Sequence, residues 1–387
     1  MIYTTNNKAK ASLSLLGMGC MRFTRTGVGI NQQKVERELL YAVENGINYF
    51  DTAYLYPGSE VALGKFIAKG YRDKMYIATK LPHYMVKSIN DVERFFCEQL
   101  KRLQTDYIDY YLFHTLNDVN SWERLKNLGI ENWIVEKKQT GRIKNIGFSF
   151  HGGAGAFKEV LDGYNWDICY IQYNYLDKTS QAGVDGLKYA VDKGVPVVIM
   201  EPLRGGQLAN KLPKQVLKML DVAKVTPAQW AFKWLYNQPE VSIVLSGMNS
   251  IEQIEENVRT ASQAVNLTEN ELKLYDTAIG EINKHTKVPC TGCGYCMPCP
   301  HGVDIPVCFN AYNSIYNQGR ITAMKEYVMC TTMKAKRTNA SLCKECGMCE
   351  KHCPQNIKIS DELKNASAYL ENVVYKIIGI VAKYFMK

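Results

Sequence analysis

The sequence predicts an α/β protein of two parts, a (β/α)8 barrel followed by a small, α-rich domain. Short apolar runs alternate with helical stretches along most of the 387 residues, and eight such units over roughly 250 residues are typical of the barrel. The second part is indicated by the cysteines, because ten of the 13 lie from Cys290 onward. A doubly wound sheet is the alternative to the barrel, but its G-x-G-x-x-G turn is absent here.

The expected strands are short apolar runs that end in polar or turn residues. In chain order they cover residues 13–18, 47–50, 75–79, 108–113, 143–148, 168–172, 196–200 and 242–245. The stretches between them are long enough for helices, for example 33–45, 90–103 and 180–193. A further helix at 271–282 is expected to follow the last strand and close the barrel.

The chain is expected to divide into three segments. These are a barrel at 1–284, a cysteine-rich domain at 285–360 with helices near 305–317 and 320–330, and a C-terminal helical segment at 361–387. Within the last segment, a helix at 370–387 places Lys376, Lys383 and Lys387 on one face. Such a helix could lie on a membrane surface, but packing against the rest of the protein is the favoured interpretation.

The composition restricts the partners and the location. Lys and Arg outnumber Asp and Glu by 47 to 38, yet the basic residues form no run, which argues against a nucleic-acid partner. The first residues lack the basic start and apolar stretch of a signal peptide, so we expect a cytoplasmic protein. In that compartment clustered cysteines indicate metal ligation rather than disulfides.

Four polar residues follow the ends of consecutive expected strands. Asp51 and Tyr56 come after the second, Lys80 ends the third and His114 follows the fourth. Since the chemistry of a (β/α)8 barrel lies at these strand ends, the four side chains are expected to meet. A lysine cation lowers the pKa of a neighbouring tyrosine and makes it a better acid. Asp51 would hold Lys80 charged, and His114 would orient a carbonyl oxygen.

This order of Asp, Tyr, Lys and His resembles the catalytic tetrad of the aldo-keto reductases, and the resemblance extends over most of residues 12–265. The segments "GFS" (147–149), "IQYN" (171–174), "EPLRGG" (201–206) and "SGMNSIEQIEEN" (246–257) agree with it. The resemblance implies NADP or NAD as cofactor and a small carbonyl compound as substrate. It also implies a cofactor site at Gly19, Ser149, Gln172, Leu203, Gly205, Gly247, Gln253, Glu256 and Asn257.

Two positions depart from that family's pattern. Met200 stands where many members carry an aromatic residue that stacks on the nicotinamide. Residues 247–253 contain none of the basic residues that pair with the 2′-phosphate in members strict for NADPH, and Arg204 and Arg259 are the available substitutes. We therefore predict a reduced preference for NADPH over NADH.

Two cysteine motifs, each ending in Cys-Pro, define the second domain. The later motif, "CKECGMCEKHCP" from residue 343, has the C-x2-C-x2-C-x3-C-P spacing of [4Fe-4S] ferredoxins, and the earlier motif, from residue 290, is one residue shorter before its last cysteine. A structural zinc site is the alternative, since paired C-x2-C motifs also bind zinc. Two triple-spaced sets fit iron and sulfide better.

The resemblance to two-cluster ferredoxins implies that each motif contributes its last cysteine to the other cluster. One cluster would take Cys290, Cys293, Cys296 and Cys353, and the other Cys343, Cys346, Cys349 and Cys299. Because the first motif is short, Cys308 or Cys330 could replace Cys299.

Three functions are compatible with these features. The first is an NAD(P)H-dependent reductase with Tyr56 as proton donor. The second is an electron-transfer or redox-sensing protein whose clusters exchange electrons with a ferredoxin or flavoprotein while the barrel only binds nicotinamide. A regulatory protein that binds nicotinamide without turnover is the third, because fold alone does not fix function.

Overall fold

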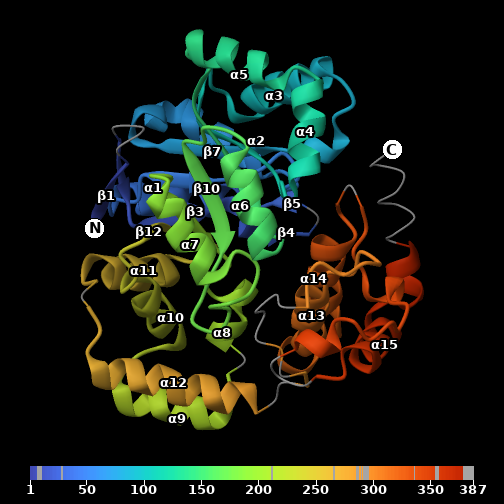
Figure 1. Cartoon of the computed structure of the whole chain (residues 1–387). Helices are drawn as coiled ribbons and strands as arrows, with labels where there is room; N and C mark the ends of the chain where they lie inside the picture. Colours follow the sequence, from blue (N-terminus) through green and yellow to red (C-terminus); the bar gives the residue numbers. More distant parts are fainter. Residues whose placement is uncertain are drawn as a thin grey trace.

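The structure is a computed structural model that describes the whole chain except residues 7–10, 28, 211, 265, 285–286, 289, 291–295, 335, 354–356 and 378–387. Eight strands form a closed barrel in the order β10-β11-β12-β3-β6-β7-β8-β9 (Figure 1). All neighbouring strands run parallel. The barrel strands are β3 (Leu16–Gly19), β6 (Tyr49–Asp51), β7 (Tyr76–Leu81), β8 (Ile108–Phe113), β9 (Ile143–Phe150), β10 (Ile168–Gln172), β11 (Val197–Met200) and β12 (Val241–Ser246). The predicted (β/α)8 fold is confirmed.

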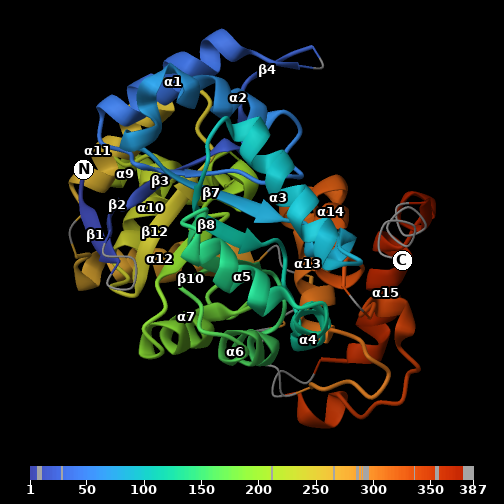
Figure 2. The same ribbon diagram turned by 90° about the horizontal axis from the view of Figure 1, so that it is seen from above.

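Helices surround the strands, as the view from above shows (Figure 2). In chain order they are α1 (Gln32–Glu44), α2 (Ser59–Phe66), α3 (Ile89–Leu103), α4 (Val119–Asn127), α5 (Ile130–Gln139), α6 (Ala154–Asp162), α7 (Gly183–Asp192), α8 (Gln207–Asn210), α9 (Lys214–Ala223), α10 (Pro227–Tyr236), α11 (Ile251–Ser262) and α12 (Glu269–Asn283). Local chemistry sets their starts: Ser88 and Asp91 form a capping box on α3, which satisfies backbone N–H groups that the first turn leaves unpaired.

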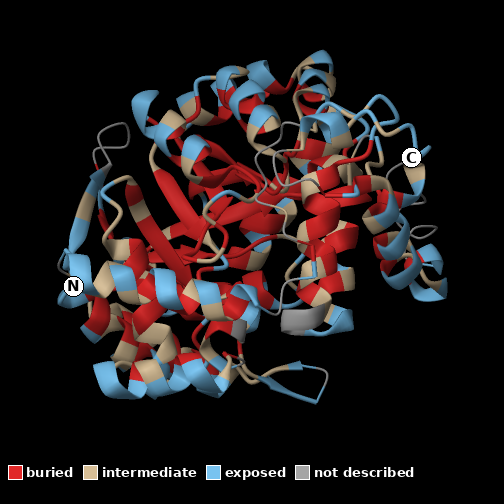
Figure 3. Ribbon diagram, turned by 60° about the horizontal axis from the view of Figure 1, so that its bottom comes forward, coloured by how far each residue is buried: buried red, intermediate tan, exposed pale blue. Residues whose placement is uncertain are grey.

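The strands are buried on both faces (Figure 3). Their inward side chains, among them Tyr49, Tyr110 and Tyr170, form a core inside the barrel. The hairpin of β1 (Tyr3–Asn6) and β2 (Ala11–Ser14) adds Ala11 and Leu13 to that core. Burial of each large apolar side chain contributes about 1.5–3 kcal/mol, so the interior is a packed core rather than a channel. The opposite, C-terminal ends of the strands are left for loops.

The cysteine-rich domain lies beside the barrel (Figures 1 and 2). Helices α13 (Ile305–Gln318), α14 (Arg320–Thr331) and α15 (Ile359–Leu370) pack together around a second apolar core. The expected helices near 305–317 and 320–330 correspond to α13 and α14. The described parts of the cysteine motifs lie outside these helices. A short 3-10 turn, Ala340–Leu342, precedes the second motif, and another, Glu350–His352, lies between its last two cysteines.

The C-terminal segment differs from the expectation. Residues 359–370 form α15, and Leu370 ends that helix instead of starting the tail helix. Ile359, Leu363, Ala366 and Leu370 are buried at helical spacing, so α15 packs on the cysteine-rich domain. The chain is helical again at 373–377, and the rest of the expected tail helix, with Lys383 and Lys387, lies outside the described residues. In the described part of the chain, no helix has the length and apolarity needed to cross a membrane.

Candidate active site and cysteine domain

The strand ends bring Asp51 and Lys80 together in the barrel mouth. Asp51 ends β6 and Lys80 lies one residue before the end of the adjacent β7. The Lys80 Nζ lies 2.6 Å from each Asp51 carboxylate oxygen and donates to the Thr52 carbonyl oxygen at 2.8 Å. Lys80 is fully buried and Asp51 is 5% exposed. A buried ammonium of this kind is tolerated because all its donors have partners.

Tyr56 and His114 complete the group. Tyr56 lies in the turn after β6, which is fixed by a backbone hydrogen bond from Tyr56 N to Ala53 O of 3.0 Å. The Lys80 Nζ is 5.1 Å from the centre of the Tyr56 ring. His114 follows β8, and its ring meets Tyr56 edge-on with 5.8 Å between ring centres. The structure thus brings the four predicted side chains together.

The charges in this group are set by burial and by the ion pair. Burial alone would lower the pKa of Lys80, but the Asp51 carboxylate opposes it and the net direction is upward. Burial, then the Lys80 ammonium, lowers the pKa of His114 well below its usual value, so this imidazole is neutral at pH 7. Burial raises the pKa of the Tyr56 phenol, and Lys80 opposes the shift without reversing it. Lys80 thus acts on the pKa of Tyr56 in the expected direction, but burial decides the net direction in this structure.

Ser149 and Gln172 lie on β9 and β10 at the same end of the barrel. The Ser149 hydroxyl oxygen accepts a hydrogen bond from Thr115 N at 2.9 Å. The Gln172 amide donates to Asp177 Oδ2 at 3.3 Å and accepts from Gln181 Nε2 at 2.8 Å. Both side chains are nearly fully buried, so their orientations are fixed by the protein.

Arg22, which is not among the predicted site residues, lies beside the predicted pyrophosphate path. Gly205 has φ of +68°, a conformation that favours glycine. A Cβ placed at Gly205 would lie 3.0 Å from Arg22 Nη2, and one at Gly247 would lie 3.0 Å from Arg22 Cδ. Gly19 ends β3 and also approaches Gly247. The exposed Arg22 therefore lies between the loop of Gly205, expected at the pyrophosphate, and the loop of Gly247, expected at the adenosine end. Only its place just after Gly19 signals this in the sequence.

Residues of the predicted adenosine end lie on and around α11. Asn257 is buried and donates to Ser246 Oγ at 3.1 Å. Gln253 accepts a hydrogen bond from Asn249 N at 2.9 Å, which fixes the loop before the helix. Glu256 is partly buried and Arg259 is exposed. Of these, Asn257 faces β12, whereas Arg259 is open to a ligand.

The Arg204 guanidinium is paired with a carboxylate of the protein, although a cofactor 2′-phosphate was its possible partner. The guanidinium pairs with Asp177 through both Nε and Nη2, and both side chains are buried. Arg204 Nη2 also reaches Asn310 Oδ1 of α13 at 3.4 Å. Asn310 Nδ2 in turn donates to Glu326 Oε1 of α14 at 2.5 Å. Arg204 therefore joins the cofactor loop to the cysteine-rich domain and is not available as a 2′-phosphate ligand.

The predicted cluster ligands surround the second core. Cys290, Cys296, Cys299, Cys343, Cys349 and Cys353 are partly buried against it. Cys346 is exposed, and Cys293 lies outside the described residues. The side chains of Cys308 and Cys330 are fully enclosed within α13 and α14. The donor set is thus rich in thiols on irregular backbone, which suits iron–sulfur ligation.

The two motifs approach each other in space. Burial, with further contributions from Glu350, Cys343 and Cys299, raises the pKa of the Cys349 thiol to about 11. Cys299 of the first motif therefore lies near Cys349 of the second. Among the described residues no three donors are placed to hold a single metal ion. In a cluster, by contrast, each thiolate binds a different iron.

Comparisons with known proteins agree with this architecture. Residues 15–279 match the model of the Aldo/keto reductase family, and residues 289–358 match that of the 4Fe-4S dicluster domain. Among curated relatives, the uncharacterized oxidoreductase YrpG of Bacillus subtilis is 26% identical over 308 residues, covering 67% of this chain and 90% of that protein. L-galactose dehydrogenase of Arabidopsis thaliana is 30% identical over 248 residues, covering 57% and 76%.

Solved structures show the same fold. The holo form of aldo-keto reductase AKR11C1 from Bacillus halodurans aligns with a TM-score of 0.60 at 28% identity, covering 72% of this chain and 96% of that one. A Klebsiella pneumoniae aldo-keto reductase in complex with NADPH aligns with a TM-score of 0.59 at 23% identity, covering 72% and 95%. The chain therefore belongs to the aldo/keto reductase family of oxidoreductases and carries a C-terminal 4Fe-4S dicluster domain in addition to its barrel.

Proposed function

We propose that this protein reduces a carbonyl compound with NADH or NADPH and that Tyr56 donates the proton. The observation that carries the proposal is the buried Asp51–Lys80 ion pair beneath the Tyr56 ring, with His114 beside it. Lys80 has no exposed surface and its Nζ lies 5.1 Å from the centre of the Tyr56 ring, which fits a cation that stabilises a phenolate.

Each side chain has a defined task. The phenol of Tyr56 hydrogen-bonds to the carbonyl oxygen and transfers its proton as negative charge develops there. Lys80 stabilises the phenolate that remains, and Asp51 keeps Lys80 charged and fixed. Because His114 is neutral, it can donate a hydrogen bond to the same oxygen without adding a competing charge.

Residues of this chain would hold the nicotinamide dinucleotide along the mouth. When bound, that cofactor supplies the hydride. Ser149 and Gln172 would bind the carboxamide, Leu203 and Gly205 would border the pyrophosphate, and Arg22 would neutralise part of its charge. Gly247, Gln253, Glu256 and Asn257 would line the adenosine end, and Gly19 would also contact the cofactor. Because Arg204 is paired with Asp177, a reduced preference for NADPH over NADH remains our expectation.

The test is Tyr56→Phe, with Tyr54→Phe in the same loop as the matched control. Removal of the proton donor should lower kcat about 10²- to 10⁴-fold, while NADH and NADPH binding, followed by quenching of protein fluorescence, should stay within about twofold. Tyr54→Phe should keep most of the activity. A Tyr56→Phe enzyme that reduces aldehydes at the normal rate would exclude this proposal.

We propose further that the dicluster domain holds two [4Fe-4S] clusters. One would be bound by Cys290, Cys293, Cys296 and Cys353, and the other by Cys343, Cys346, Cys349 and Cys299. The proximity of Cys299 to Cys349 supports the exchange of last cysteines between the motifs. Anaerobic iron and sulfide analysis should give about eight of each per chain, falling by about half in Cys349→Ala. A zinc-loaded protein without sulfide would contradict this assignment.

A second candidate function is electron exchange with a ferredoxin or flavoprotein. It is favoured by the direct contact between the cofactor loop and the cluster domain through Arg204 and Asn310. Anaerobic titration with NADH or NADPH, or with a reduced ferredoxin or flavoprotein, should then bleach the visible absorbance of the clusters. Unchanged absorbance with all of these donors would exclude it.

A further inference from the structure

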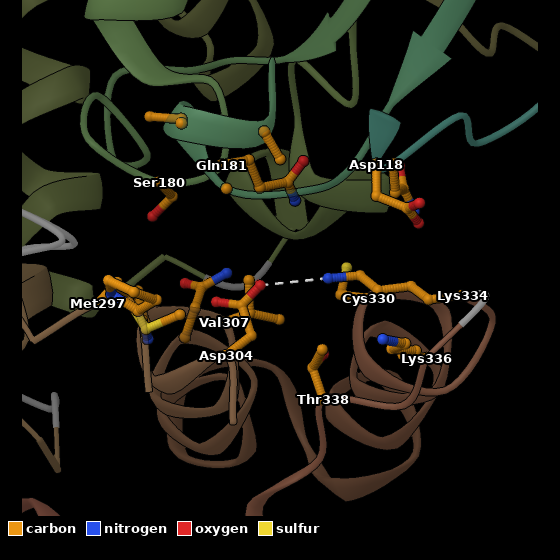
Figure 4. A pocket seen from close by; sticks show the side chains of 18 of the residues that line it. Asp118, Ser180, Gln181, Met297, Asp304, Val307, Cys330, Lys334, Lys336 and Thr338 are labelled. Carbon is orange, nitrogen blue, oxygen red and sulfur yellow. Dashed lines mark hydrogen bonds and ion pairs between the residues drawn. The ribbon is translucent and has the colours of Figure 1, made fainter. Parts of the chain in front are cut away.

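A cavity of about 760 Å³ lies between the barrel mouth and the cysteine-rich domain. Figure 4 shows its two walls: Asp118, Ser180 and Gln181 from the barrel loops on one side, and Met297, Val307, Thr338 and their neighbours from the cysteine-rich domain on the other. Its volume is within the range of small-molecule sites, which often form where two domains meet. The cysteine-rich domain therefore provides a wall that a barrel alone would lack.

Hydrogen-bonded side chains connect the cavity wall to the predicted nicotinamide site and to the surroundings of His114. Gln181, in its wall, donates to Gln172 at 2.8 Å and lies 3.2 Å from His151 Nδ1. Asn117, also in the wall, holds His151 N through its Oδ1 at 2.6 Å. His151 in turn lies near enough to His114 for their charges to interact. The cavity thus adjoins the nicotinamide end of the site.

The accessible lining is mainly apolar with a few polar groups, and it favours an uncharged ligand of the same character. Lys334 and Asp304 neutralise each other across 3.2 Å, as the dashed line in Figure 4 marks. Asn117 Nδ2 and Thr338 Oγ1, one from each wall, are buried and have no hydrogen-bond partner among the described residues. Unpaired buried polar atoms are unfavourable, and hydroxyl or amide groups of a ligand could pair with them. Apart from the Lys334–Asp304 pair, the acidic residues Asp118, Glu159 and Glu326 outnumber the one other lysine, Lys336, and would repel an anionic ligand.

We propose that this cavity binds the non-reacting part of the carbonyl substrate, and that the cysteine-rich domain thereby helps to set substrate specificity. The ligand class is an aldehyde or ketone with an uncharged, mainly apolar tail that carries a hydroxyl or amide group. This inference rests on the proposed reductase function, because it assigns the outer part of the same site.

The test compares two aldehydes that share a reacting group: benzaldehyde and a 4-formylbenzamide with a hydroxylated N-alkyl chain. In the cluster-loaded protein, Thr338→Val removes only the hydroxyl and keeps the side-chain shape. It should lower the ratio of kcat/KM for the tailed over the bare aldehyde about fivefold. Ser180→Trp narrows the cavity from the barrel side and should lower the ratio more than about tenfold. Thr277→Val, on the exposed face of α12, should leave it unchanged.

A third aldehyde, with a carboxylate at the end of the tail, tests the ligand class. Preference for it over the hydroxylated compound would overturn the assignment to uncharged substrates. An unchanged ratio in both Thr338→Val and Ser180→Trp would overturn the cavity inference while leaving the proposed function intact. If Tyr56→Phe reduces benzaldehyde normally, the proposed function fails whatever the cavity variants do.

Discussion

The barrel and the cysteine-rich domain position their functional groups in different ways. In the barrel, Asp51 and Lys80 lie on paired strands and hold each other at 2.6 Å within a continuous apolar core. In the cysteine-rich domain, the described cysteines of the two motifs lie on irregular backbone outside α13, α14 and α15, and Cys346 is exposed. Pairing of the strands therefore positions the barrel site, whereas the conformation of the cysteine-bearing loops depends on the metal that the thiols bind.

This difference implies different sources of stability. Partly buried cysteines such as Cys290 and Cys299 form part of the boundary of the second core. A domain of about 70 residues buries too little apolar area to be very stable alone. Metal binding to thiolates then becomes a large share of its folding free energy. The barrel has a large apolar core of its own, so we expect it to fold without metal.

The largest expected effect follows from removal of iron. Anaerobic chelation of iron should abolish hydrogen-exchange protection in peptides from 296–334 and 336–353, because metal-dependent folding energies reach about 10 kcal/mol. Peptides from β6 to β8 should keep their protection, and NADH should still bind. Exchange followed by mass spectrometry, with iron-reconstituted protein as control, measures both parts in one sample. Equal loss of protection in the barrel would show that the two parts are not independent.

A smaller effect is expected from Lys80→Met. This change leaves the Asp51 carboxylate buried without its partner, which costs about 3–5 kcal/mol. The control is Lys69→Met, which breaks an ion pair of the same 2.6 Å length with Glu36 but on an exposed side chain. That pair should be worth less than about 1 kcal/mol. Urea unfolding of the barrel, followed by tryptophan fluorescence, compares the two variants.

The Asp51→Asn, Lys80→Met double variant separates stability from catalysis. It removes both charges, so part of the lost stability should return, while carbonyl reduction should stay at background. If Lys69→Met and Lys80→Met lower the free energy of unfolding by similar amounts, burial of the Asp51–Lys80 ion pair has no energetic consequence, contrary to our expectation from the structure.

Much of the barrel could be predicted from the sequence because its strands are buried on both faces. The expected strand at 108–113 coincides with β8, and that at 196–200 differs from β11 by one residue. Long apolar runs with clear ends leave little freedom of interpretation. The tetrad follows directly, since its members lie at or just after strand ends.

Other parts depend on contacts that no local pattern encodes. Arg204 is adjacent to Gly205 in sequence, but its partners Asp177 and Asn310 come from different elements. Helix α15 has apolar residues at helical spacing, namely Ile359, Leu363, Ala366 and Leu370. The surface on which they pack is formed by α13 and α14, and the local sequence does not specify it. The net direction of the Tyr56 pKa likewise depends on burial, which is a property of the closed site.

The smallest predicted effect concerns the contact between the two parts. Burial raises the pKa of Glu326 from 4.5 to about 7, although Arg204 opposes the shift. Because the folded-state pKa is higher than the unfolded-state value, the folded protein favours the protonated form. Stability linked to Glu326 is thus fully present below about pH 4.5 and declines as the pH rises to about 7, by at most about 3 kcal/mol.

Glu326→Gln should remove this dependence, because a neutral amide can still accept from Asn310 and bond to Ser314, as the carboxyl group does. Melting temperatures of the wild type and the variant should therefore converge near pH 4.5 and separate by pH 7.5, with the variant higher. Glu362→Gln, on α15, is the control. The Glu362 carboxylate is only partly buried and accepts a hydrogen bond of 3.3 Å from Asn365 Nδ2, so this variant should melt like the wild type. If Glu326→Gln lowers the melting temperature at pH 7.5, the Glu326 charge is stabilised by Arg204 more than burial disfavours it, and the two parts are joined by an ionic link.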